Sequence, residues 1–98
     1  MPAEPNDGAP LPITAVIITL NEETNLGRCL ASLRGLVSEI VVLDSGSTDR
    51  TTAIAREYGA RVEVRAWQGY VAQKNAALAL ASQEWALCVD ADEEVSPE

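Results

Sequence analysis

Apolar runs typical of strands alternate along the chain with segments whose apolar residues recur at helical spacing. The first run, residues 13–19 (ITAVIIT), is continuous and β-branched, which is typical of a strand covered on both faces. Residues 26–33 then carry one apolar stripe, which predicts a helix that begins near Asn21 and ends at Gly35. Residues 39–44 (EIVVLD) repeat the pattern of a buried strand.

Turn-forming and capping residues follow the second apolar run. Residues 45–49 (SGSTD) predict a loop, and the segment after it predicts a helix over residues 50–58. Thr48 or Asp49 would cap this helix, because short polar side chains accept hydrogen bonds from its free amides. Gly59 would end it, in the position where glycine commonly follows a helix.

The last part of the chain predicts two more strands around one helix. Residues 61–65 (RVEVR) alternate strictly, which indicates an edge strand with Val62 and Val64 facing inward. Residues 71–81 predict an alanine-rich helix. Residues 85–90 (WALCVD) predict a fourth, buried strand.

Strands that alternate with single helices favour right-handed crossovers and a parallel sheet. We therefore expect an α/β, Rossmann-like fold of about four strands in the order 3-2-1-4, with helices on both faces. The carboxyl ends of parallel strands share one edge, and the crevice between the first and fourth strands is the expected ligand site.

Composition limits the size and partners of the protein. The 98 residues suffice for one small domain, which we assign to residues 13–98 after a proline-rich, flexible leader at residues 1–12. The net charge of −8 disfavours binding to nucleic acid, and an anionic ligand would need a helix terminus, a basic side chain or a metal ion. No apolar run reaches the roughly 18 residues of a transmembrane helix.

Cysteine and histidine usage narrows the chemistry further. Cys29 and Cys88 lie far apart in apolar stretches, which predicts reduced thiols in the core of a cytosolic protein. The chain has no histidine, so a zinc site and histidine-dependent catalytic triads lose their support.

Two aspartates follow the fourth predicted strand. Asp90 and Asp92 are separated by one residue, so both carboxylates would project to the same side of an extended chain. Carboxylates in this arrangement can hold a hard divalent cation, which would neutralise a diphosphate. The alternative is a solvated acidic edge of the sheet.

Four further residues fall at the same edge or near it. Asp44 ends the second strand and could accept hydrogen bonds from a base or ribose, or could cap the loop that Ser45 begins. Asn21 and Glu22 leave the first strand, where a helix N-cap is the alternative for Asn21.

Basic and aromatic residues supply the other candidates. Lys74, the only lysine, lies near the start of the third predicted helix, where a bound phosphate would compensate its charge; an ordinary solvated lysine is the alternative. Trp67 and Tyr70 could face a sugar or base, but we expect them to anchor their loop to the core.

Four segments in the same order resemble the nucleotide-binding half of the family 2 glycosyltransferases of GT-A fold. They are VIITLNEETNLGRCLASL, EIVVLDSGSTDRTTAIAREYGARV, WQGYVAQKNAALALA and WALCVDADEEVSPE. Within the family, VVLDSGSTD and WQGYVAQKNAAL look most like the bacterial lipopolysaccharide-core β-glucosyltransferases.

The resemblance implies roles for these residues. Asn21, Glu22 and Asp44 would lie at the nucleoside, Lys74 near the diphosphate, and Asp90 and Asp92 at Mg²⁺ or Mn²⁺. Ser45 and Asp90 are further candidate contacts to the substrate. Substrates would be a nucleoside diphosphate sugar, most often UDP-linked, and a saccharide or lipid-linked saccharide acceptor, with inversion at the anomeric carbon. The family places its general base after the second aspartate, so we expect it beyond residue 98 and expect a truncated domain without transfer activity of its own.

Two other functions stay open at this point. A nucleotidyltransferase would also use paired aspartates, although it usually has a glycine-rich basic loop where this chain has TLNEETNLG. A non-catalytic α/β binding module is the second alternative. For a glycosyltransferase the resemblance implies a location in the cytoplasm, peripheral at the inner face of the membrane. A fourth strand whose edge is left uncovered would favour self-association of the chain.

Overall fold

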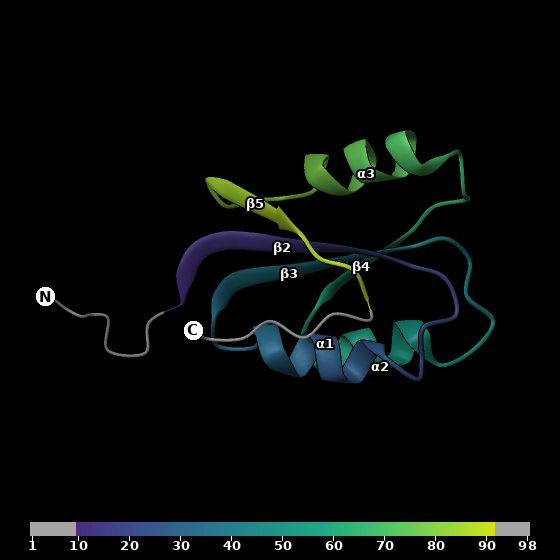
Figure 1. Cartoon of the computed structure of the whole chain (residues 1–98), viewed down its shortest axis with the longest axis horizontal. Helices are drawn as coiled ribbons and strands as arrows, with labels where there is room; N and C mark the ends of the chain where they lie inside the picture. The colour runs from purple at the N-terminus through teal and green to yellow at the C-terminus, as the bar shows by residue number, and fades with distance from the viewer. Residues whose placement is uncertain (1–9, 92–98) are drawn as a thin grey trace, which may run out of the picture.

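The computed structural model describes residues 10–91 as seven elements in strict β-α alternation (Figure 1). The strands are β2 (Leu11–Thr19), β3 (Val37–Asp44), β4 (Arg61–Val64) and β5 (Trp85–Cys88). The helices are α1 (Leu26–Leu33), α2 (Thr51–Glu57) and α3 (Tyr70–Ala79). The number and order of these elements confirm the pattern predicted from the sequence.

The four strands form one parallel sheet in the order β4-β3-β2-β5. This is the predicted order 3-2-1-4, with the first strand in the chain beside the fourth. The β2–β3 pair runs as far as Thr19 opposite Asp44, whereas the β2–β5 pair ends at Val16 opposite Cys88. Beyond Cys88 the sheet therefore opens on the β5 side of β2.

Helices cover both faces of the sheet, as expected (Figure 1). On one face, Ala15 and Ile17 of β2 pack with α1 and α2 in the larger hydrophobic core. On the other face, Val16 of β2 and Leu43 of β3 pack against Ala77 of α3 in a smaller core. Successive residues of a strand point to opposite faces, so an apolar run such as residues 15–18 supplies both cores.

The two predicted glycine stops are confirmed, but the helix starts differ from prediction. Gly35 and Gly59 follow α1 and α2 with φ of 82° each, a conformation that costs glycine little. The helix α1 begins at Leu26 instead of near Asn21, because Asn21 has φ of 54° and cannot continue into a helix.

The second helix and the first strand also differ at their ends. The N-cap position of α2 is Arg50, although the Asp49 carboxylate still accepts the amide hydrogen of Thr51 at 2.9 Å. The strand β2 begins at Leu11 and so includes the last two residues assigned to the leader.

The two outer strands are more exposed than predicted. Val62 packs against the larger core, but Val64 is 62% exposed, so only one of the two valines of β4 is packed into the core. In β5, which we expected to be buried, Trp85 is 63% and Leu87 42% exposed. Cys88 is also exposed, whereas Cys29 is buried as predicted. Within residues 10–91, no helix has both the length and the apolar character needed to cross a bilayer.

Candidate functional site

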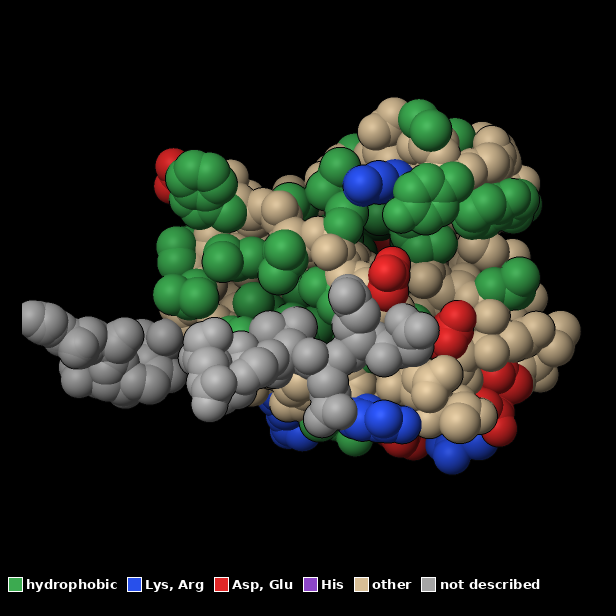
Figure 2. All heavy atoms as spheres, viewed as in Figure 1, with side chains coloured by type: hydrophobic (Ala, Val, Ile, Leu, Met, Phe, Trp, Pro, Cys, Tyr) green, Lys and Arg blue, Asp and Glu red, His purple; other side chains and the backbone are tan. Residues whose placement is uncertain are grey.

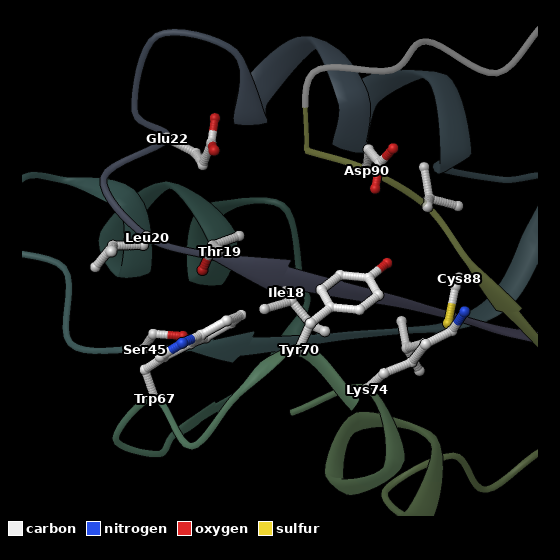
Figure 3. A pocket seen from close by; sticks show the side chains of 12 residues that line it. Ile18, Thr19, Leu20, Glu22, Ser45, Trp67, Tyr70, Lys74, Cys88 and Asp90 are labelled. Carbon is white, nitrogen blue, oxygen red and sulfur yellow. The ribbon is translucent and has the colours of Figure 1, made fainter. Parts of the chain in front are cut away.

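A cavity of about 440 Å³ opens where β2 and β5 diverge, at the carboxyl ends of the strands. This is the crevice predicted from the strand order. Its walls come from β2, from the segment after β5, from Ser45 after β3, and from α3 with the loop before it (Figure 3). The lining residues are Val16, Ile18, Thr19, Leu20, Glu22, Ser45, Trp67, Tyr70, Lys74, Cys88, Val89 and Asp90.

Acidic side chains and aromatic rings lie on opposite sides of this cavity. In Figure 3, Glu22 and Asp90 lie on one side of β2, and Trp67, Tyr70 and Lys74 lie on the other. Figure 2 shows the same division, with acidic side chains facing a basic side chain among hydrophobic ones. A ligand with an anionic part and a flat ring could contact the cation and the aromatic faces together.

The Asp90 side chain points into the cavity because its two neighbours are buried. Val89 and Ala91 are 6% and 5% exposed and belong to the core on the α1 side, so Asp90 projects the other way. The Val89 amide donates to the Val16 carbonyl at 3.0 Å, and the Asp90 carbonyl accepts a hydrogen bond from the Cys29 thiol at 3.6 Å. The backbone on both sides of the carboxylate is therefore fixed to the sheet and to α1.

Glu22 is held in place by the first residue of α2 and by the loop between β3 and α2. Its amide donates to Thr51 Oγ1 at 2.8 Å, and the amide of Asn21 donates to Ser47 Oγ at 2.8 Å. The Asn21 side chain in turn accepts the amide hydrogen of Thr48 at 2.8 Å. Asn21 does not line the cavity and is not a helix N-cap; it ties together the two loops that border the cavity.

Asp44 lies behind the cavity wall, with 1% of its surface exposed. Its carboxylate accepts hydrogen bonds from Thr19 Oγ1 at 2.7 Å and from the amides of Gly46 and Ser47 at 3.0 and 2.7 Å. Burial raises the pKa of Asp44, but the hydrogen bonds from Ser47, Thr19 and Gly46 outweigh it and lower the pKa below its ordinary value. Asp44 therefore caps the loop after β3, as in the second of the two roles predicted for it.

Lys74 is the fifth residue of α3, one residue further from the helix start than predicted, because the helix begins at Tyr70. It is half-buried, and its ammonium group lies 5.8 Å from the centre of the Tyr70 ring. Tyr70 and Trp67 are 57% and 53% exposed, so the expectation that they anchor the loop to the core is wrong. Both rings present their surface to the cavity instead.

Of the predicted site residues, the cavity brings together Glu22, Ser45, Lys74 and Asp90. Asp92 lies outside the described residues. Within residues 10–91 no group of three potential metal-ligating side chains occurs. The Asp90 carboxylate suits Mg²⁺ or Mn²⁺, which proteins often hold through one or two carboxylates together with substrate phosphates. The described residues thus fit a cation that arrives with a diphosphate.

Several contributors to the cavity were not predicted as site residues. Leu20 and Cys88 line the cavity, and Gln73 lies behind it with its side chain bonded to Ser45. The sequence could have indicated that Gln73 faces the sheet, because it stands four residues before Ala77 and so lies on the same apolar side of α3. No signal in the sequence indicates that the fourth strand would leave Cys88 exposed.

Comparison with known proteins gives a consistent family. The family model described as Glycosyl transferase family 2 matches residues 14–98. An uncharacterised glycosyltransferase of Rickettsia conorii is 48% identical over 86 residues, which are 88% of this chain and 30% of that protein. The lipopolysaccharide core biosynthesis glycosyltransferase LpsC of Rhizobium meliloti is 47% identical over 88 residues, 85% of this chain and 32% of that protein. The chain thus spans about a third of the length of these relatives.

Solved structures show the same likeness. Glucosyl-3-phosphoglycerate synthase from Mycobacterium tuberculosis in complex with UDP matches with a TM-score of 0.72 and 33% identity, over 83% of this chain and 34% of that one. Its complex with Mn²⁺, UDP and glucosyl-3-phosphoglycerate matches with a TM-score of 0.71 and 31% identity, over 84% of this chain and 35% of that one. This likeness confirms the expected GT-A type of fold.

Proposed function

The chain belongs to glycosyl transferase family 2, and from that premise we propose that residues 13–98 form the donor-binding part of an inverting glycosyltransferase. The donor is a nucleoside diphosphate sugar, UDP-linked, and the acceptor is a saccharide or lipid-linked saccharide. Family membership favours sugar transfer over the nucleotidyl transfer considered from the sequence. The observation that carries the proposal is the cavity that joins Glu22, Ser45, Lys74 and Asp90 at the carboxyl end of the sheet.

In this proposal the two sides of the cavity have different tasks. Lys74 attracts the diphosphate, because it is the one basic side chain among the lining residues. Trp67 and Tyr70 offer aromatic faces to the base or the sugar, and Ser45 offers its hydroxyl. A direct nucleoside contact by Asn21 or Asp44 is also part of the proposal, in addition to their role in holding the loops.

The acidic side of the cavity is the proposed place of the cation. Asp90, together with Asp92, would hold Mg²⁺ or Mn²⁺ through carboxylate oxygens. The bound cation supplies charge neutralisation for the leaving nucleoside diphosphate. The Mn²⁺ and UDP named for the mycobacterial synthase support this choice of cofactor and donor.

The pathway and the rest of the reaction are inferred from the relatives. The likeness to LpsC supports lipopolysaccharide or another bacterial surface polysaccharide as the product, made in the cytoplasm at the inner face of the membrane. We place the general base outside residues 13–98 and therefore expect no sugar transfer by this chain alone. We also propose that the exposed strand β5 lets the chain self-associate.

Calorimetric titration of the 98-residue chain tests the donor site. UDP and UDP-glucose should bind in the presence of Mn²⁺, and chelation of the metal by EDTA should weaken both, because the cation offsets repulsion between the diphosphate and Asp90. GDP and ADP serve as comparison ligands for the base. The proposal fails if the chain is folded by circular dichroism and binds none of these nucleotides.

A further inference from the structure

Gln73 is a fully buried polar side chain on the face of α3 that packs against the sheet. Its Nε2 atom donates to Ser45 Oγ at 3.2 Å and to the Arg65 carbonyl oxygen at 3.3 Å. Its Oε1 atom is buried and has no hydrogen-bond partner among the described residues. Gln73 thus connects α3 to the end of β3 and to the segment after β4, directly behind the cavity.

The partners of Gln73 fix the direction of these hydrogen bonds. The Arg65 carbonyl can only accept, so the amide nitrogen of Gln73 must face it, and the same nitrogen then faces Ser45. Ser45 Oγ is therefore the acceptor in its bond with Gln73. A hydroxyl group also has one hydrogen to donate, and within residues 10–91 no acceptor for the Ser45 hydrogen is found. Since Ser45 lines the cavity, that hydrogen is left for a ligand.

The backbone around Ser45 allows little freedom to reorient. The Ser45 amide donates to the Thr19 carbonyl at 2.9 Å, which continues the β2–β3 pairing by one residue. The next amide, of Gly46, is bound to the Asp44 carboxylate at 3.0 Å. With its backbone fixed by β2 and its oxygen by Gln73, the Ser45 hydroxyl is preorganised before a ligand arrives.

The two hydrogen bonds that Gln73 donates stabilise the fold, but they do not account for its buried Oε1 atom. Gln73 packs on the same side of α3 as Ala77, whose methyl group belongs to the smaller core. A buried oxygen without a partner costs free energy that an apolar side chain of similar length would not. Buried polar groups without a partner call for an explanation, and a role at the cavity supplies one here.

We propose that Gln73 is a positioning residue for nucleotide binding, which holds the Ser45 hydroxyl so that it donates to an acceptor oxygen of the bound nucleoside diphosphate. The inference rests on the proposed function and deepens it by one step. Gln73 acts through Ser45 and does not touch the ligand, since it does not line the cavity. The residue after it, Lys74, does line the cavity, so the same turn of α3 sets the cation and the hydroxyl relative to each other.

A double-mutant cycle with UDP and Mn²⁺ tests this coupling on the 98-residue chain. Ser45→Ala should weaken UDP binding about 10- to 100-fold, as expected for the loss of one hydrogen bond to a charged group. Gln73→Met keeps the length of the side chain without its donors and should weaken binding by a similar factor. In the Gln73→Met background, Ser45→Ala should have almost no further effect, because the hydroxyl is no longer held. Asn75→Ala, on the exposed side of α3, is the matched control and should leave the affinity unchanged.

The outcomes separate this inference from the proposed function. Fully additive losses in the cycle, or an unchanged affinity of Ser45→Ala, would overturn the role of Gln73 while UDP binding itself stands. A folded wild-type chain that binds no UDP would overturn both. If Gln73→Met does not fold, nuclear magnetic resonance of the Gln73 side-chain amide tests the coupling to Ser45 instead. UDP should shift the amide signals in the wild type and leave them in place in Ser45→Ala; equal shifts in both would refute the coupling.

Discussion

At the scale of single residues, Asp44 shows why a strand-end carboxylate is difficult to interpret from sequence. The pattern that places it at the end of β3 fits a ligand contact and a loop cap equally well. The structure gives its carboxylate donors from Thr19, Gly46 and Ser47, and these hold the loop beside the cavity. The number of local donors, which no periodicity reveals, is what establishes the loop-capping role of Asp44.

Asp44→Asn should destabilise the chain by about 2–3 kcal/mol. The NH2 group of asparagine would face at least one of the buried hydrogen-bond donors that now bind the carboxylate, and two donors repel each other. The wild-type stability should also depend on acid. The pKa of Asp44 is lowered by folding, so its contribution is complete above the unfolded value of about 3.9 and is lost as the pH falls through the folded pKa. Urea unfolding between pH 3 and 7 measures both effects. A variant with the same acid dependence as the wild type would contradict this account of Asp44.

Lys74 permits a prediction about the ligand itself. Lys74→Met should weaken UDP binding about tenfold, roughly 1.4 kcal/mol, and leave the binding of uridine unchanged, because uridine lacks the diphosphate. Arg56→Met removes an equal charge from α2, which packs on the opposite face of the sheet, and should have little effect. Fluorescence titration of the cavity residue Trp67 can follow both ligands. An equal loss for UDP and uridine would place Lys74 away from the diphosphate.

At the scale of elements, the interior of each strand and helix was easier to predict than its ends and its exposure. Continuous β-branched residues in β2 and β3 are sufficient to predict central strands, and Gly35 and Gly59 mark helix ends through local backbone geometry. The start of α1 was missed because it depends on hydrogen bonds between Asn21 and the distant loop after β3. Contacts between remote segments leave no periodic signal in either partner.

The exposure of β5 and of the cavity aromatics was missed for the same reason. The segment of β5 has the composition of a buried strand, but its exposure is set by what covers it and not by its own residues. Trp67, in the loop before α3, and Tyr70, the first residue of α3, likewise have core-like side chains in a segment whose position depends on the whole sheet. The sequence could thus predict the crevice and its charged residues, but not its aromatic wall.

Glu39 links four elements at the end of the sheet opposite the cavity. Its Oε1 atom accepts hydrogen bonds from Thr14 Oγ1 at 2.8 Å and from the amide and hydroxyl of Ser82 at 3.0 and 2.8 Å. Its Oε2 atom lies 3.7 Å from the guanidinium group of Arg61 in β4. Glu39 therefore fastens the connection between α3 and β5 to the three other strands.

Glu39→Ala should speed amide hydrogen exchange at Ser82 and along β5, where this connection is released, and should cost about 1–2 kcal/mol of stability. Glu57→Ala is the matched control, because its ion pair with Arg50 is exposed on both sides and contributes little. Hydrogen exchange followed by mass spectrometry measures the local effect. Uniform acceleration across the whole sheet would show that Glu39 stabilises the fold globally and does not fasten this connection.

At the scale of the whole molecule, the net charge of −8 is difficult to reconcile with an anionic ligand. The cavity has two lining carboxylates, Glu22 and Asp90, and one lining cation, Lys74. Lys74 alone cannot balance those carboxylates and a diphosphate, so the charge of the cavity favours the proposed divalent cation. In the absence of Mn²⁺, UDP affinity should therefore stay below its value with Mn²⁺, even when the salt concentration is raised.

The hydrophobic surface over β5 has a consequence for the state of the chain in solution. Trp85 and Leu87 expose 63% and 42% of their surfaces on a strand whose only pairing partner among the described residues is β2 (Figure 2). An exposed edge strand with large apolar side chains favours pairing with another copy. Sedimentation velocity should show a monomer at low concentration and a dimer at high concentration. Leu87→Lys should shift this equilibrium toward the monomer, because a charge on the edge opposes pairing, whereas Val64→Lys on the opposite edge strand should change it less. A wild-type chain that stays monomeric throughout would contradict self-association through β5.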